Sequence, residues 1–104
     1  MATKKIRSIT SATPTILIRK NGTVNSTNIN SISICNNSAN PATSISLHLW
    51  SGTGGDPVHP FIHNVTIPSG VSLVLKDGLG FDSSVYNLRI SNAGTDPDLT
   101  VIIT

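Results

Sequence analysis

Short segments that alternate apolar and polar residues, separated by turn residues, make up most of the chain. The clearest runs from Ala42 to Trp50, where Ile45, Leu47 and Leu49 share one face. A period of two places such residues on one side of a β-strand. Comparable segments recur between clusters of Gly, Pro, Asn and Asp, so we predict about seven to nine short strands.

The composition supports the same structural class. The chain of 104 residues contains no Glu and no Gln, whereas Ser, Thr and Asn account for 36 residues and Ile and Val for 20. Ser, Thr and Asn compete with the helical backbone, and β-branched residues pack well in sheets. We therefore predict an all-β, single-domain antiparallel β-sandwich over residues 1–104, either immunoglobulin-like or a jelly roll. Residues 1–13 are a candidate N-terminal docking arm.

Two segments are apolar on both faces, and this pattern predicts cover on both sides. They are Ile16 to Ile18 and Val101 to Ile103. Their second face must be buried under a loop or against another subunit. Ile16, Ile18 and Ile102 are accordingly candidate partner contacts, and we expect a homo-oligomer or a multi-copy assembly.

Basic residues gather near the start of the chain. Lys4, Lys5 and Arg7 form one group, and Arg19 and Lys20 form a second. Nucleic-acid binding through Lys4, Lys5 and Arg7 is the third functional hypothesis and the least favoured, because the net charge is only +2 and the four aromatic residues do not interleave with the basic ones. Two interpretations are favoured over it: an edge strand kept soluble by its charges, or an arm that contacts an acidic protein surface.

Trp50 is the most distinctive single residue, because it ends a predicted strand just before the glycine-rich loop Ser51 to Asp56. It can cap one end of the sandwich core. It can also form the tip of a sugar-stacking or partner-binding site, and this alternative makes a glycan-binding module the second functional hypothesis.

Catalytic and metal-binding patterns are weak. His59 and His63 would lie ~13 Å apart on a strand, too far to share one ion. Cys35 falls in a strand pattern, and the acids are five aspartates placed in turns. We therefore expect no enzyme activity, no metal and no cofactor. No apolar run approaches a membrane span, and we expect a soluble protein from a reducing compartment.

Four segments together resemble the small all-β virion proteins of tailed bacteriophages. In order they are a strand ending in Asn-Asn-Ser, a Ser/Thr-rich strand, an Ile-Pro-Ser-Gly segment and a final hairpin strand: Ile32–Ser38, Ala42–Leu49, Val65–Leu75 and Tyr86–Ile90. The match covers roughly residues 29–104. It implies a structural protein of the virion, assembled in the host cytoplasm. Capsid decoration or cement is the first expectation and a neck or tail component the alternative, with capsid or neck and tail proteins as partners.

Overall fold

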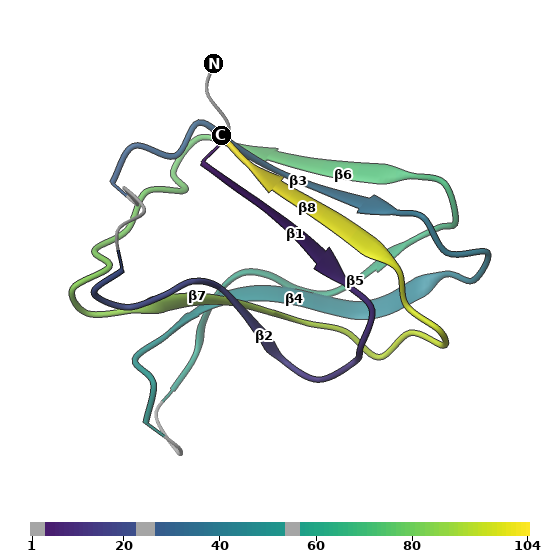
Figure 1. Cartoon of the computed structure of the whole chain (residues 1–104), viewed down its shortest axis with the longest axis horizontal. Helices are drawn as coiled ribbons and strands as arrows, with labels where there is room; N and C mark the ends of the chain where they lie inside the picture. Colours follow the sequence, from purple (N-terminus) through teal and green to yellow (C-terminus); the bar gives the residue numbers. More distant parts are fainter. Residues whose placement is uncertain (1–3, 23–26, 54–56) are drawn as a thin grey trace.

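A computed structural model of the protein describes residues 4–22, 27–53 and 57–104. These residues contain eight β-strands (Figure 1). No helix occurs in these ranges. The predicted all-β antiparallel sandwich is confirmed. The strands are β1 (Lys5–Ile9), β2 (Thr15–Ile18), β3 (Ser31–Asn36), β4 (Ala42–Trp50), β5 (His59–Ile67), β6 (Ser72–Lys76), β7 (Asn87–Ser91) and β8 (Leu99–Ile103).

The strands are divided between two four-stranded sheets. Sheet A has the order β1-β8-β3-β6 and sheet B the order β2-β7-β4-β5, and every pair is antiparallel. The chain therefore doubles back at the β4–β5 hairpin, and the successive pairs β4–β5, β3–β6, β2–β7 and β1–β8 alternate between the sheets. This is the strand order of a jelly roll, which selects one of the two predicted sandwich types.

The core lies between the inner faces of the two sheets. Ile32 and Ile34 of β3 are completely buried, as are Ile45 and Leu47 of β4, two of the three residues that the sequence pattern places on one face of that segment. Further buried apolar side chains complete the core: Ile9, Leu17, Ile18, Ile29, Ala42, Ile67, Leu79, Phe81, Leu88, Ile90, Leu99, Val101 and Ile103.

A β-bulge resolves the two-sided apolar pattern of β2. The register with β7 shifts between Ile16 and Ile18, so that Leu17 and Ile18 are both buried, at 2% and 1% exposure. Ile18 is therefore a core residue, which removes it from the candidate partner contacts. In β8 the alternation is regular, because Val101 is buried and Ile102 lies on the outer face of sheet A.

Turns lie where Gly, Asn and Asp punctuate the sequence. Gly22 N–H donates to the carbonyl of Arg19 across a turn in which Asn21 has a φ of 59°. Gly70 has a φ of 74° in the turn before β6, and Asp77 and Gly78 both have positive φ after it.

Candidate interaction site

The open side of the sandwich lies where β1 and β2 come together. Each is the edge strand of its sheet, with β8 as the neighbour of β1 and β7 as the neighbour of β2. The two strands also approach each other across the gap between the sheets (Figure 1). Edge strands leave alternate backbone N–H and C=O groups without a strand partner.

The pleat of β1 directs its cations toward this opening. Lys5 lies opposite Ile103 and Arg7 opposite Val101, and both of these β8 residues are buried in the core. Directly opposed residues of an antiparallel pair share a face. Lys5 and Arg7 therefore occupy the inner side of β1.

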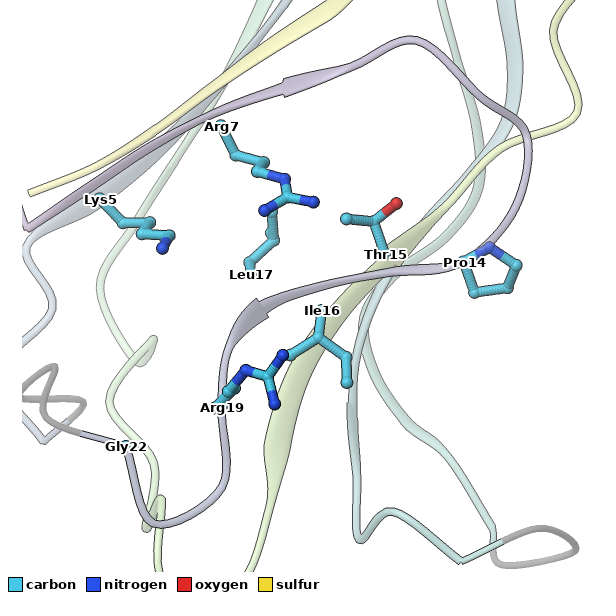
Figure 2. A pocket seen from close by; sticks show the side chains of 8 residues that line it. All are labelled: Lys5, Arg7, Pro14, Thr15, Ile16, Leu17, Arg19 and Gly22. Atoms are coloured by element: carbon cyan, nitrogen blue, oxygen red, sulfur yellow. The ribbon is translucent and has the colours of Figure 1, made fainter.

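A cleft of about 620 Å³ lies between the two strands, and we call it the basic cleft (Figure 2). In Figure 2, Lys5 and Arg7 extend from β1 into the space above β2, and Arg19 lies beside Ile16. The lining residues are Lys5, Arg7, Pro14, Thr15, Ile16, Leu17, Arg19 and Gly22. The cleft thus contains members of both basic groups of the sequence, Lys5 and Arg7 from the first and Arg19 from the second, together with the predicted apolar contact Ile16.

The charge in this cleft has no compensating carboxylate among the described lining residues. Its lining contains three cations, Lys5, Arg7 and Arg19, and no carboxylate among the described residues. None of the three has an ion-pair partner in residues 4–22, 27–53 and 57–104. Guanidinium groups recognise carboxylates and phosphates through paired hydrogen bonds, so this arrangement is suited to an anionic ligand. Lys4, by contrast, lies just before β1 and does not line the cleft.

The outer face of sheet A is a second surface, and it shares β1 with the basic cleft. One register row crosses all four strands through Ile6, Ile102, Ser33 and Val74. Ile6 is 61% exposed and Val74 is 49% exposed, while Ile102 is half-buried. The adjacent row consists of Ser8, Thr100, Cys35 and Ser72. Both rows are uncharged.

Polar side chains at the borders of this face bond to one another. The hydroxyls of Ser31 and Thr104 lie 2.8 Å apart, and Asn37 Nδ2 donates to Thr100 Oγ1 at 2.8 Å. The half-buried thiol of Cys35 donates to Asn37 Oδ1 at 3.5 Å. Because these groups already have partners, covering the face costs less than covering unpaired polar groups.

Trp50 lies on the outer face of sheet B rather than at the end of the core. The guanidinium carbon of Arg89 lies 4.0 Å from the Trp50 ring centroid, and Arg89 Nε donates to His48 Nε2 at 2.8 Å. Burial lowers the pKa of His48, and the charges of Arg89 and His63 lower it further. A neutral imidazole can accept the bond from Arg89. Arg89 thus occupies one face of the half-buried Trp50 ring.

The glycine-rich loop beside Trp50 is described only in part. Gly52 has a φ of 101°, and a side chain at this position would approach Asn87 Nδ2. Residues 54–56 of the predicted sugar-stacking tip lie outside the described ranges.

Two histidines of β5 contact different groups. His59 packs edge-on against Tyr86, with ring centroids 5.6 Å apart. His63 Nδ1 lies 3.4 Å from Ser46 Oγ, and its Nε2 lies 3.1 Å from the amide nitrogen of Asn64. If that amide donates to Nε2, the ring proton is on Nδ1, so the Ser46 hydroxyl accepts from His63 as well as from the Asn64 backbone N–H. In this tautomer His63 does not act as a base toward Ser46.

Metal-binding groups are dispersed in the part of the chain that the structure describes. No three His, Cys, Asp or Glu side chains there lie close enough together to hold an ion.

Sequence reasoning did not identify Arg89, which contacts the Trp50 ring and His48 on the outer face of sheet B. It pairs with His48 across β4 and β7, two strands separated by β5 and β6 in the chain, so no local pattern indicates the contact.

No protein family model matches the chain, and neither a curated protein nor a solved structure matches it. Within the described ranges there is no helix with the length and hydropathy needed to cross a membrane.

Proposed function

We propose that the chain is a non-enzymatic structural protein that works by packing against neighbouring subunits, as a decoration or cement protein of a tailed-phage capsid. A neck or tail component is the alternative position in the same particle. The virion setting comes from the sequence resemblance of Ile32–Ser38, Ala42–Leu49, Val65–Leu75 and Tyr86–Ile90. The jelly-roll order agrees with it by fold-level analogy, because this fold recurs in viral capsid proteins.

The observation that carries the proposal is the outer face of sheet A. Ile6, Ile102 and Val74 supply apolar area in one row, and the hydroxyl groups around them are uncharged. The centres of protein interfaces are depleted in charge, since burying an unpaired charge is costly. Neighbouring subunits can therefore cover this face without burying an unpaired charge in its two central rows.

Charge insertion into this face tests the proposal. Particles are assembled with Val74→Lys or with Val85→Lys, and the incorporated protein is quantified by mass spectrometry after gradient purification. Val85 is a matched control, because it is 43% exposed against 49% for Val74 and lies outside both sheets. We expect Val74→Lys to lose incorporation and Val85→Lys to retain it. Equal incorporation of the two variants, both folded by circular dichroism, contradicts the proposal.

A glycan-binding module is the second candidate function. The observation that favours it is the Trp50 ring, which is partly exposed on the outer face of sheet B and held from one side by Arg89. Jelly rolls also occur in lectins, and this too is an analogy of fold.

A further inference from the structure

We propose that the basic cleft binds an extended acidic peptide segment of a partner protein, with the peptide added as a strand along the open side of the sandwich. This site is separate from the outer face of sheet A, so the proposal goes beyond the structural role given above.

The spacing of the cations matches an extended peptide. Lys5 and Arg7 are two residues apart on one face of β1, a separation of roughly 7 Å. Side chains at alternate positions of an extended peptide repeat at the same distance. Carboxylates at alternate positions can therefore meet Lys5 and Arg7 in register, while Arg19 supplies charge from the β2 side of the cleft.

The backbone of the two edge strands provides the second half of the recognition. β1 and β2 each have one sheet neighbour, so their other edges are available for added hydrogen bonds. A peptide that pairs with such an edge gains affinity from its main chain and specificity from its side chains. Pro14 and the half-buried Ile16 add apolar area to the lining of the cleft.

The lining favours a peptide over a nucleic acid. None of the described residues that line the cleft is aromatic, so the cleft offers no platform on which bases could stack. The net charge of +2 also gives a weak overall field for a polyanion.

The test uses a fluorescently labelled synthetic peptide that alternates aspartate and threonine, with binding measured by anisotropy and mapped by amide chemical shifts. Arg7→Gln is compared with Lys76→Gln, which removes the same charge from the opposite edge strand of sheet A. Retained shift dispersion establishes that each variant is folded. An alternating lysine–threonine peptide and a short oligothymidylate serve as the other probes.

We expect the acidic peptide to bind with amide shifts concentrated in β1 and β2. Arg7→Gln should weaken binding about tenfold, because it removes a charge-assisted hydrogen bond, and Lys76→Gln should change it less than about twofold. The Arg7→Gln, Arg19→Gln double variant should weaken it further. The proposal is overturned by absence of binding at about 1 mM peptide, by equal effects of Arg7→Gln and Lys76→Gln, or by tighter binding of the oligothymidylate at the same residues. Because incorporation of the Val74 variant is measured separately, each proposal can fail without the other.

Discussion

Asn36 ties the two sheets together at one end of the sandwich, and its replacement by alanine should be among the most destabilising polar changes. The side chain is completely buried at the end of β3. Its Nδ2 donates to the carbonyls of Asn40 at 2.9 Å and of Ile67 in β5 at 3.0 Å. Its Oδ1 accepts from Ser38 N–H at 3.0 Å.

The magnitude follows from these three hydrogen bonds. A buried hydrogen bond contributes about 1 kcal/mol net, and partners left unsatisfied add to the cost. Asn36→Ala should therefore lower the free energy of unfolding by about 2–4 kcal/mol, a large part of the roughly 5–15 kcal/mol available to a domain of this size.

Equilibrium unfolding in urea measures the effect, and the adjacent asparagine provides the control. Asn37 is exposed; its side chain donates to Thr100 Oγ1 and accepts a long 3.5 Å bond from the Cys35 thiol. Asn37→Ala should cost less than about 1 kcal/mol. Equal losses for Asn36→Ala and Asn37→Ala would refute the argument that Asn36 links the sheets.

Three further predictions concern the core, His48 on sheet B and the half-buried Trp50. Ile34→Ala should lower the free energy of unfolding by about 2–5 kcal/mol, whereas Ile6→Ala should be nearly neutral in urea titrations, because Ile34 is completely buried and Ile6 is 61% exposed. The pKa of His48 is lowered from its ordinary value of 6.5, so His48 takes up a proton at a higher pH in the unfolded chain than in the folded chain. The free energy of unfolding should therefore fall as the pH drops below 6.5. Urea midpoints at several pH values should show this loss reduced in His48→Gln; an unchanged slope contradicts it. If the chain binds glycans, Trp50→Ala should abolish signals on a glycan array; identical signals exclude Trp50 as the stacking ring.

Much of the fold could be predicted because strand formation leaves a local pattern. The segment from Ala42 to Trp50 is predicted with the bounds that β4 has, and Ile45 and Leu47 of its apolar face are completely buried. Pro60 has no N–H to donate to a neighbouring strand, which favours an edge position, and β5 is an edge strand of sheet B. In each case the signal lies within one strand.

The jelly-roll order could not be predicted, because it depends on pairs of strands that are distant in the chain. β1 pairs with β8 across almost the whole sequence, and this pairing decides which side of β1 carries Lys5 and Arg7. The position of Arg19 could not be predicted either, because it lines the same cleft as Lys5 and Arg7 only where the edge strands β1 and β2 lie close together. The bulge that buries Ile18 is likewise a property of its pairing with β7.

The central claim is that the chain is a structural subunit of a particle. The most direct measurement is quantitative mass spectrometry of virus particles purified by density gradient from cells infected with a phage that carries this gene. We predict that the chain is present in many copies per particle and remains bound through purification. Its absence from the particles, with the protein found only in the soluble fraction of infected cells, would contradict the account.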